Sequence, residues 1–331
     1  MTHTWVLGVD SGGSGLRVTL ADASMPMGGS PRPVLVSDKP VRTGSAGIDA
    51  EHLVEQLVPM ARSLLETVGG TSVTSAAIGA AGMSTMGGQL RAALPDALGS
   101  ALGVRRLALA SDAVTAYAGA LGQRSGVVVA AGTGLVAMGT DLVEWRRADG
   151  WGHLLGDCGG GAWIGRAGLE AALRAFDGRP DGSRALLAAA EESFGPAQSI
   201  PEAVYPRSDR PAVLASFAPR VGRCATEGDE VAAGILALAA RHMAQAAAAV
   251  LRPGAEAGAD RQYEVALTGG LLKLGDPLRN PLRAALSVEL PGVREVSAKG
   301  DPLAGAVLLA GALAGSSLQL PRHPTLLAVT E

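Results

Sequence analysis

The stretch Trp5-Val-Leu-Gly-Val-Asp-Ser-Gly-Gly-Ser-Gly-Leu-Arg-Val-Thr-Leu-Ala21 predicts a β-hairpin. An apolar run ends at Asp10, a turn rich in glycine follows, and a second run with alternating character returns. Strand, glycine turn and strand in this order are typical of a hairpin. The pattern recurs about 120 residues later, where the run Gly126–Ala131 is followed by Gly132-Thr-Gly134 and another apolar run. This repetition predicts two related α/β units.

The rest of the sequence predicts strands that alternate with helices. Apolar residues at helical spacing predict a helix over Asp49–Val68, with Asp49 as its N-terminal cap. A segment rich in proline and charge, Ile200–Pro211, predicts a surface connection. The alternation favours a mostly parallel sheet that helices cover. The other expected elements are the strands Pro33–Ser37, Val73–Ala80, Arg106–Ala110 and Glu264–Thr268 and the helices Ala113–Leu121, Gly161–Phe176, Gly182–Phe194, Val231–Leu251 and Pro302–Leu313.

The length of the chain bears on its domain organisation. Its 331 residues favour about two domains, and an apolar content of 47% supports one or two sizeable cores. We place the boundary near Gly119–Gly126, which gives an N-terminal domain of residues 1–119 and a C-terminal domain of residues 120–331. The second domain would carry a helical insertion, and the final helix could pack back on the first domain.

Composition and charge argue against several classes of protein. A net charge of −3 disfavours electrostatic binding of DNA or RNA phosphates. The two cysteines, Cys158 and Cys224, are too few for a disulfide scaffold or a four-cysteine zinc site, and they suit a reducing compartment. The N-terminus shows no secretory signal, and the charge-free stretches Thr67–Leu90 and Pro302–Pro321 fall short of the roughly 20 apolar residues that span a bilayer. We therefore expect a cytoplasmic protein without nucleic-acid or membrane partners.

The first glycine turn is a candidate phosphate-binding loop. Glycines let the backbone approach phosphate oxygens, and consecutive amides form a concavity that binds anions. Asp10, at the carboxyl end of its strand, is placed to hold a hydrated Mg²⁺, and the hydroxyl of Ser14 can add a donor. An ordinary tight hairpin with a capping aspartate explains the same residues. Because the turn leads into a strand, it is no dinucleotide fingerprint, and it lacks the lysine of a Walker A motif.

The second glycine turn, Gly132-Thr-Gly134, makes nucleotide binding the better explanation. Two matched glycine hairpins from two halves of a chain can clasp a polyphosphate from both sides. A further glycine pair, Gly269-Gly270, follows the strand Glu264–Thr268 and would allow close approach of a flat ring or a ribose. A helix-start turn explains that pair equally well.

An aspartate follows the strand Arg106–Ala110 at the start of the next expected helix. Ligands of open α/β sheets collect at the carboxyl ends of strands, which makes Asp112 a candidate for catalysis. Aspartate is also a preferred N-cap residue, so Asp112 could cap the helix, act in catalysis, or do both.

The densest motif is Asp149-Gly-Trp-Gly-His-Leu-Leu-Gly-Asp-Cys-Gly-Gly-Gly-Ala-Trp-Ile-Gly165. Its glycines, tryptophans and carboxylates indicate a loop that faces a sugar, with Trp151 as an apolar wall and Asp157 as an acceptor for hydroxyl groups. His153 is better explained as a plain loop histidine than as a base or ligand, since no second histidine lies at metal spacing. Cys158 is more commonly a packed thiol than a reactive one.

Together these motifs resemble those of the BadF/BadG/BcrA/BcrD-type ATPase family, part of the actin/hexokinase/Hsp70 superfamily. The N-acetylglucosamine kinases are the members that the chain resembles most, over roughly residues 5 to 313. The Trp-Gly-His-Leu-Leu-Gly-Asp stretch is the most specific element. The motifs, in the order that the family uses, are Asp10-Ser-Gly-Gly-Ser14, Ser111-Asp112-Ala113, Gly132-Thr-Gly134, Gly150-Trp-Gly-His-Leu-Leu-Gly-Asp157 and Thr268-Gly-Gly270.

The resemblance implies an α/β fold of two ribonuclease-H-like, actin-like ATPase domains around a central cleft that holds ATP, Mg²⁺ and sugar. It implies that Asp112 is the base that takes a proton from the 6-hydroxyl of the sugar, and that Asp10 orients Mg²⁺ through water. The other residues implied are Gly12, Gly13, Ser14, Thr133 and Gly134 for the phosphates, Gly269 and Gly270 for the adenosine, and Trp151, Gly152 and Asp157, with Asp112, for the sugar.

Three positions depart from the pattern usual in this family. A Gly-Pro-Ser/Thr-Asn motif, whose asparagine touches the sugar, is replaced by Gly44-Ser-Ala-Gly47. Cys158 takes the place of a glutamate, and Leu135 takes the place of a serine at the end of the second phosphate loop. These changes leave the phosphotransfer residues in place and bear on the choice of sugar.

We therefore expect an ATP-dependent kinase that phosphorylates the 6-hydroxyl of N-acetylglucosamine or a related hexosamine, with ATP and Mg²⁺ as cofactors. One alternative is an ATPase activator of a radical dehydratase, in which two subunits share an iron–sulfur cluster and each gives two cysteines. Cys158 in its glycine-rich loop suits that role better than Cys224, which lies in an expected helical region. Another alternative is a non-catalytic sensor of sugar or nucleotide. The resemblance also allows a homodimer.

Overall fold

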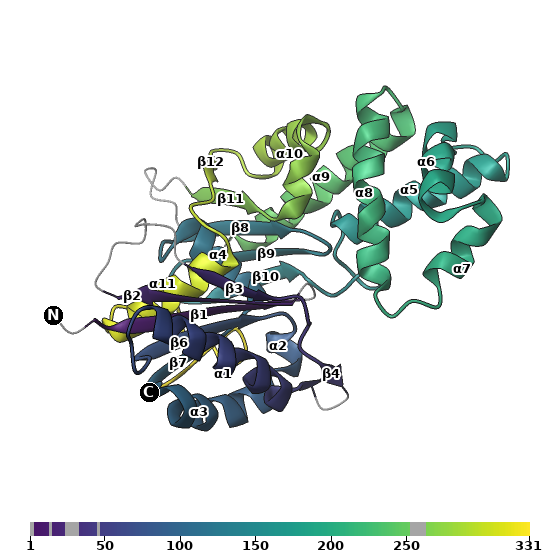
Figure 1. The fold of residues 1–331 in the computed structure, drawn as a ribbon. Helices are drawn as coiled ribbons and strands as arrows, with labels where there is room; N and C mark the ends of the chain where they lie inside the picture. The colour runs from purple at the N-terminus through teal and green to yellow at the C-terminus, as the bar shows by residue number, and fades with distance from the viewer. Residues whose placement is uncertain (1–2, 13–14, 24–32, 45–46, 252–262) are drawn as a thin grey trace. The chain divides into compact units, whose positions relative to one another are not determined.

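The computed structural model describes residues 3–12, 15–23, 33–44, 47–251 and 263–331. The chain divides into two compact units, each with its own sheet and helices (Figure 1). Unit 1 comprises Met1–Gly126, Thr140–Trp145 and Ser297–Glu331, and unit 2 comprises Val127–Gly139 and Arg146–Val296.

The sheet of unit 1 has six strands in the order β13-β7-β6-β1-β2-β3. β1 runs parallel to β6, and β6 runs parallel to β7, whereas β2, β3 and β13 each run antiparallel to a neighbour. The prediction of a mostly parallel sheet is therefore wrong. A tight glycine turn can join only antiparallel neighbours, so the predicted hairpin itself requires a mixed sheet. The strands are β1 (Trp5–Gly12), β2 (Gly15–Asp22), β3 (Val34–Ser37), β6 (Ser75–Ala80), β7 (Arg106–Ser111) and β13 (Leu327–Thr330).

Helices cover both faces of this sheet, because successive residues of a strand point to opposite sides. Leu7 and Val9 of β1 share a core cluster with α1 (Ala50–Thr67) and α3 (Gly88–Leu102). The alternate residue Gly8 lies against Val307 of α11, so closely that a Cβ at position 8 would lie 2.5 Å from a methyl group. The N-cap role predicted for Asp49 is confirmed, since its carboxylate accepts the amide of His52 at 3.0 Å. The remaining elements of unit 1 are β4 (Thr43–Gly44), β5 (Gly47–Ile48), α2 (Met83–Met86), α4 (Asp112–Leu121) and α11 (Pro302–Ala314).

The second sheet repeats the strand order of the first. Its order is β10-β9-β8-β11-β12. Read from its β3 edge, the first sheet has the order β3-β2-β1-β6-β7 before β13. The first, second, third, fourth and fifth of these strands along the chain therefore take the same places in both sheets. β8 and β9 take the place of the first hairpin, and β11 runs parallel to β8 as β6 does to β1. The predicted repeat of an α/β unit is confirmed. The strands are β8 (Gly126–Ala131), β9 (Leu135–Thr140), β10 (Trp145–Asp149), β11 (Glu264–Thr268) and β12 (Arg294–Ser297).

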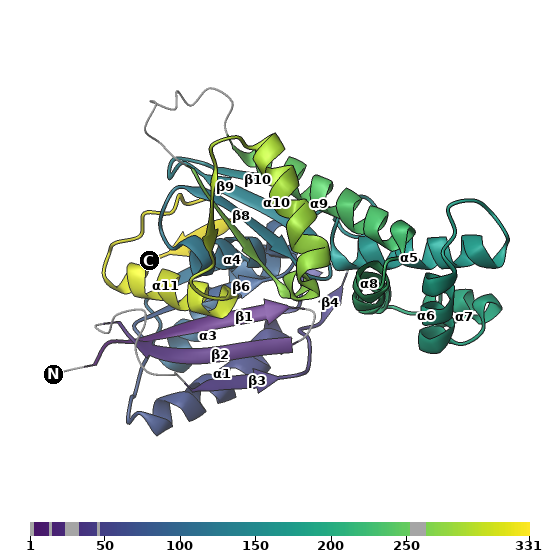
Figure 2. The ribbon, with the colours of Figure 1, turned by 90° about the horizontal axis from the view of Figure 1, so that it is seen from above.

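Unit 2 carries more helix than unit 1, and several of its helices lie away from the sheet (Figure 2). The surface connection expected at 200–211 is instead occupied by α7 and the start of α8. Pro201 and Pro211 are the second residues of these helices, in the first turn, where the missing amide would have had no partner within the helix. The helices are α5 (Gly161–Phe176), α6 (Arg184–Phe194), α7 (Ile200–Val204), α8 (Arg210–Thr226), α9 (Glu230–Val250) and α10 (Asp276–Glu289), with short 3₁₀ turns at Ala197–Ser199 and Gly270–Leu274.

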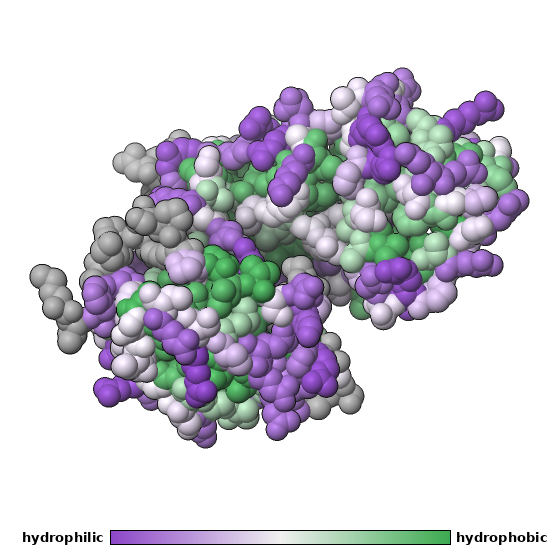
Figure 3. Space-filling view, in the orientation of Figure 1, coloured by the Kyte–Doolittle hydropathy of each residue, from purple (hydrophilic) through white to green (hydrophobic). Residues whose placement is uncertain are grey.

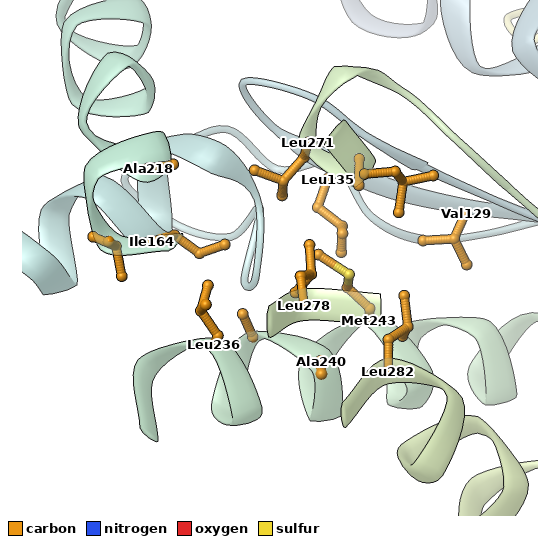
Figure 4. Close-up of a cluster of buried hydrophobic side chains, with 14 of the residues drawn as sticks. Val129, Leu135, Ile164, Ala218, Leu236, Ala240, Met243, Leu271, Leu278 and Leu282 are labelled. Carbon is orange, nitrogen blue, oxygen red and sulfur yellow. The ribbon is translucent and has the colours of Figure 1, made fainter. Parts of the chain in front are cut away.

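Aliphatic side chains form the core of unit 2, as the low aromatic content requires. Side chains from the sheet, α5, α9 and α10 gather there, among them Val129, Leu135, Ile164, Met243 and Leu278 (Figure 4). Of the helices that the structure describes, α9 alone is long and apolar enough to cross a membrane, and 44% of its apolar window is buried within the protein. On the outside, hydrophobic residues gather in patches between hydrophilic ones (Figure 3).

Candidate functional site

Asp10 lies near the carboxyl end of β1, directly opposite Arg17 on β2. Two nitrogens of Arg17 donate to one carboxylate oxygen of Asp10: Nη2 lies 2.6 Å and Nε 3.0 Å from Oδ2. The third donor, Nη1, lies 2.6 Å from Oδ2 of Asp301, just before α11. Oδ1 of Asp10 accepts no hydrogen bond from any residue that the structure describes. The aspartate expected to orient a metal is thus held by one oxygen.

The first glycine turn is described only in part. Gly12 ends β1, and a Cβ there would lie more than 4 Å from the rest of the described residues apart from its chain neighbours, which leaves space beside this backbone. Gly13 and Ser14, expected at the phosphates, lie outside the described residues. Gly15 has a φ of +120°, and a Cβ there would lie 2.0 Å from the carbonyl oxygen of Ser37. Only glycine fits at that position, which fixes the return of the chain into β2.

Asp112 lies at the same edge of the sheet as Asp10. In the register of the parallel strands, Asp10 is level with Gly79 of β6, and Gly79 is level with Ala110 of β7. Because neighbouring strands lie roughly 4.8 Å apart, the two strand ends are about 10 Å apart. Two residues after Ala110, Asp112 opens α4. Both carboxylates therefore lie at the carboxyl ends of parallel strands, at one edge of the sheet of unit 1.

Ser111, and not Asp112, caps helix α4. The hydroxyl of Ser111 accepts the amide of Val114 at 3.3 Å, which places Asp112 at the first helical position. The interpretation of Asp112 as the N-cap is wrong, because the preceding serine already fills that place. Asp112 is exposed, and its Oδ1 accepts the amide of Ala113 at 2.9 Å. A negative charge in the first turn of a helix is stabilised by the helix dipole.

The second glycine turn is bound to the start of α5. The amide of Gly132 donates to the carbonyl of Gly134 at 3.0 Å, which closes the turn. The carbonyl of Gly132 accepts a hydrogen bond from the amide of Gly161, and the carbonyl of Thr133 accepts one from the amide of Ala162, each at 2.8 Å. The amides of Gly132, Gly161 and Ala162 are therefore already used, and among the described residues of the turn the amides of Thr133 and Gly134 are left to meet a phosphate.

Gly269 and Gly270 follow β11, the parallel neighbour of β8. Gly269 has a φ of +106°, and a Cβ there would lie 2.1 Å from the carbonyl oxygen of Ala131. A side chain on Gly270 would meet nothing within 4 Å. The register pairs Thr268 with Ala130, so both glycine elements lie at the carboxyl edge of the second sheet. This is the edge where open α/β sheets bind ligands.

Two carboxylates organise the loop between β10 and α5. Oδ1 of Asp149 accepts a hydrogen bond from the amide of Asp157 at 2.5 Å, and Oδ2 accepts one from the amide of Cys158 at 2.9 Å. Oδ1 of Asp157 in turn accepts the amide of Gly152 at 3.2 Å. Asp149 and Asp157 both have left-handed backbone, with φ of 62° and 55°. The carboxylates compensate for these unfavourable conformations by binding the loop's own amides.

Asp157 also ties this loop to the second glycine turn. Its Oδ2 lies 2.4 Å from the place that a Cβ of residue 134 would take, so any side chain at position 134 would force one of the two groups to move. Burial raises the pKa of Asp157, while hydrogen bonds from the amides of Gly152 and Leu135 act in the opposite direction. The carboxylate expected to bind sugar hydroxyls is therefore half-buried and engaged with backbone.

Trp151 presents an aromatic surface beside this loop. Its side chain is 65% exposed, and the guanidinium of Arg147 lies 4.4 Å from the ring centroid. A cavity of about 330 Å³ lies beside it, between the loop and α9. Its lining includes Asp149, Trp151, Leu155, Cys158, His242 and Gln245.

The family comparison agrees with these motifs. Residues 7–310 match the profile of the BadF/BadG/BcrA/BcrD ATPase family. The chain belongs to this family. An N-acetylmuramic acid/N-acetylglucosamine kinase from Clostridium acetobutylicum is 32% identical over 212 residues, which are 62% of this chain and 67% of that protein. An N-acetyl-D-glucosamine kinase from Dictyostelium discoideum is 29% identical over 206 residues, 60% of this chain and 64% of that protein.

One solved structure has this fold over nearly the whole chain. It comes from Chromobacterium violaceum, is provisionally named an N-acetylglucosamine kinase, and matches with a TM-score of 0.67 at 26% identity. The match covers 93% of this chain and 99% of that chain. The α/β fold expected from the resemblance, with its two related sheets, is confirmed.

The two cysteines of the chain lie in different surroundings. Cys224 is 5% exposed, lies in α8 and belongs to the core cluster of unit 2. Cys158 is half-buried in the loop after β10, and burial raises the pKa of its thiol. A cluster shared between two subunits needs accessible thiolates, so Cys224 does not suit the role of a ligand in a dehydratase activator.

Three residues around the site were missed in the sequence. Arg17 forms ion pairs with both Asp10 and Asp301, and Asp149 shapes the loop that carries Trp151 and Asp157. The register of the first hairpin could have identified Arg17, since a tight turn places it opposite Asp10. No local signal connects Asp301 with residues at the other end of the chain.

Proposed function

We propose that the protein is an ATP-dependent kinase that phosphorylates the 6-hydroxyl of N-acetylglucosamine or a related hexosamine. The observation that supports this most directly is the placement of Asp10 and Asp112 at one carboxyl edge of three parallel strands. A kinase of this type needs one carboxylate near the metal and a second one near the acceptor hydroxyl. The curated relatives from two organisms carry kinase names for amino sugars, which supports the same substrate class.

Asp112 is the residue that we assign as the base. Its carboxylate is exposed at the N-terminus of α4, where it can accept a proton from a bound hydroxyl group. Such assistance is typically worth about 10²–10⁴ in rate. Most of the remaining barrier in phosphoryl transfer is lowered by positioning and by compensation of charge.

Asp10 is the residue that we assign to Mg²⁺. Carboxylate oxygens are the donors that this hard cation prefers, and Oδ1 of Asp10 accepts no hydrogen bond from the described residues. The residues present thus fit a cation held through water. When bound, Mg²⁺ compensates for the charge of the phosphates. Arg17 meanwhile holds the other oxygen of the carboxylate in place.

Unit 2 supplies the groups that we assign to nucleotide and sugar. Thr133 and Gly134 would meet phosphate oxygens with their amides, and the open face of Gly270, next to Gly269, would admit the adenosine. Trp151 offers an exposed ring for the apolar face of a sugar. Gly152 and Asp157, which bind each other, would form the polar part of the same subsite.

One assay tests this assignment. We would measure ADP formation by the full chain with Mg²⁺ and ATP in the presence of glucose, glucosamine, N-acetylglucosamine or N-acetylmuramic acid. We expect ATP turnover to rise many-fold with an N-acetylated amino sugar, and mass spectrometry of the product to show a phosphate on the 6-oxygen. ATP hydrolysis that is the same with every sugar would contradict the kinase assignment and favour a sensor or an activator.

A further inference from the structure

Three charged side chains form a chain of ion pairs at the edge of unit 1. Arg17 lies between two carboxylates, with Asp10 on the neighbouring strand and Asp301 at the start of α11. Asp10 is the most buried partner, with 18% of its side chain exposed, against 36% for Arg17 and 52% for Asp301. Two carboxylates against one guanidinium leave the group with a formal charge of −1.

Asp301 has two tasks at once. Its Oδ1 accepts the amide of Ala304 at 2.9 Å and so caps α11, while Oδ2 accepts from Arg17 at 2.6 Å. Helix α11 packs on β1, where Val307 lies against Gly8. The guanidinium is therefore anchored on a helix that is itself fixed on the strand of Asp10.

We propose that Arg17 and Asp301 are positioning residues for the metal-binding carboxylate of Asp10. Arg17 grips Oδ2 with two donors and so orients Oδ1. Asp301 anchors Arg17 and balances its charge, so that Asp10 keeps an excess of negative charge for a cation. This inference rests on the proposed function only in taking a metal–nucleotide complex as the ligand.

The charge balance is the step that needs Asp301. With Arg17 alone, the carboxylate of Asp10 would form a neutral pair and would attract a divalent cation weakly. The second carboxylate restores a net negative charge without approaching the metal. Outer-shell residues of a metal site typically change metal affinity about 10-fold to 100-fold when they are mutated.

Two conservative variants separate the two tasks. Arg17→Lys keeps the charge but loses the planar grip of two donors on one oxygen. Asp301→Asn keeps a good N-cap for α11 and removes one negative charge. Arg322→Lys and Glu331→Gln are the matched controls, because Arg322 and Glu331 form an exposed ion pair elsewhere in unit 1.

The readout is the affinity of the full chain for Mn²⁺ in the presence of a non-hydrolysable ATP analogue, measured by electron paramagnetic resonance. Melting temperatures without ligand serve as the measure of a purely structural effect. We expect both site variants to bind Mn²⁺ about 10-fold more weakly, while both controls bind it like the wild type. The loss of Mn²⁺ affinity in Asp301→Asn is expected to shrink when the salt concentration rises from about 0.05 M to about 0.5 M. The missing charge acts on the cation from a distance, and salt screens such an interaction.

The outcomes keep this inference apart from the proposed function. Wild-type affinity in either site variant, even with a lowered melting temperature, would overturn the positioning role of that residue. Mn²⁺ binding that does not change in Asp10→Asn would overturn the metal assignment on which the inference depends. The binding measurement uses no sugar, so a wild type that binds Mn²⁺ but phosphorylates none of the sugars would leave the inference standing and would contradict the kinase.

Discussion

The carboxylate of Asp149 accepts the backbone amide of Asp157 at 2.5 Å and thereby closes the loop that carries Trp151. Its other oxygen accepts the amide of Cys158 at 2.9 Å. Seven residues lie between strand β10 and the first of these amides, and most are glycine or apolar, so the loop has few other polar side chains with which to close. The geometry of the candidate sugar loop thus depends on the side chain of Asp149, the last residue of β10.

Asp149→Asn is expected to weaken both the fold of unit 2 and the binding of sugar. The variant loses one charge-assisted acceptor, worth about 2 kcal/mol, which corresponds to a fall of about 4–8 °C in melting temperature. In the assay of the proposed kinase, the KM for sugar should rise more than the KM for ATP. Differential scanning fluorimetry and steady-state kinetics measure the two effects.

Asp141→Asn is the matched control for this variant. Asp141 also accepts hydrogen bonds from two amides, those of Val143 at 2.9 Å and Glu144 at 3.0 Å, but both reach its Oδ1, in a turn of unit 1. Because the single oxygen of asparagine can still accept both amides, we expect a smaller loss of stability, with an unchanged KM for sugar. An equal rise in KM in both variants would show that general destabilisation, and not the shape of the loop, sets sugar affinity.

Asp112→Asn is expected to lower kcat by about 10²–10⁴, because the side chain can no longer accept the proton of the hydroxyl group. Asparagine is nearly isosteric, and Ser111 still caps α4, so the melting temperature should stay close to that of the wild type. Isothermal titration with an ATP analogue should give an unchanged Kd.

The control for Asp112 is its neighbour. Ser111→Ala removes the N-cap and should cost about 1 kcal/mol of stability, while kcat stays within a few-fold of the wild type. A large fall of kcat in Ser111→Ala together with near-normal turnover in Asp112→Asn would reverse the assignment of the base.

Local sequence patterns predicted most helices and strands of this fold. They did not predict features that depend on contacts between residues far apart in the sequence. The two glycine hairpins, the capped helix α1 and helix α5 follow from spacing and cap residues within a few positions of each other. Helix α3 was not predicted, because Gly88 opens it and Pro95 lies inside it, and both residues argue against a helix by themselves. Its buried leucines, Leu90, Leu94 and Leu98, offset these propensities by packing on α1.

The same limit applies to the candidate site. Asp10 and Asp112 could be named because each lies at the carboxyl end of an apolar strand, which is a local feature. Their partners could not be named in the same way. Asp301 reaches Arg17 only through the packing of α11 on the first sheet, and the buried state of Asp157 depends on the glycine turn that packs against it.

Gly134→Ala is expected to disturb the contact between the second glycine turn and Asp157. The added methyl group would lie 2.4 Å from Oδ2 of Asp157, so one of the two must move. Such overpacking typically costs about 1–3 kcal/mol. Because the amides of this turn are the proposed phosphate donors, the KM for ATP should rise together with the fall in melting temperature.

Gly132→Ala is the control within the same turn, since a methyl group there meets nothing within 4 Å. It should leave the melting temperature unchanged. A loss of stability in Gly132→Ala as large as that in Gly134→Ala would show that the turn as a whole resists side chains, and that Asp157 does not cause the constraint.

The titration of Asp157 should be visible in the pH dependence of stability. Burial raises the pKa of this carboxyl group above its ordinary value of 3.8, so the folded protein binds its proton more tightly than the unfolded chain does. The ionised form therefore destabilises the fold at neutral pH, and this penalty disappears as the pH falls through the raised pKa toward 3.8. Asp157→Asn removes this titrating group. The melting temperature of the variant minus that of the wild type should therefore fall steadily as the pH is lowered over that interval. Paired melting curves at a series of pH values measure the difference, and a difference that stays constant with pH would contradict a raised pKa at this residue.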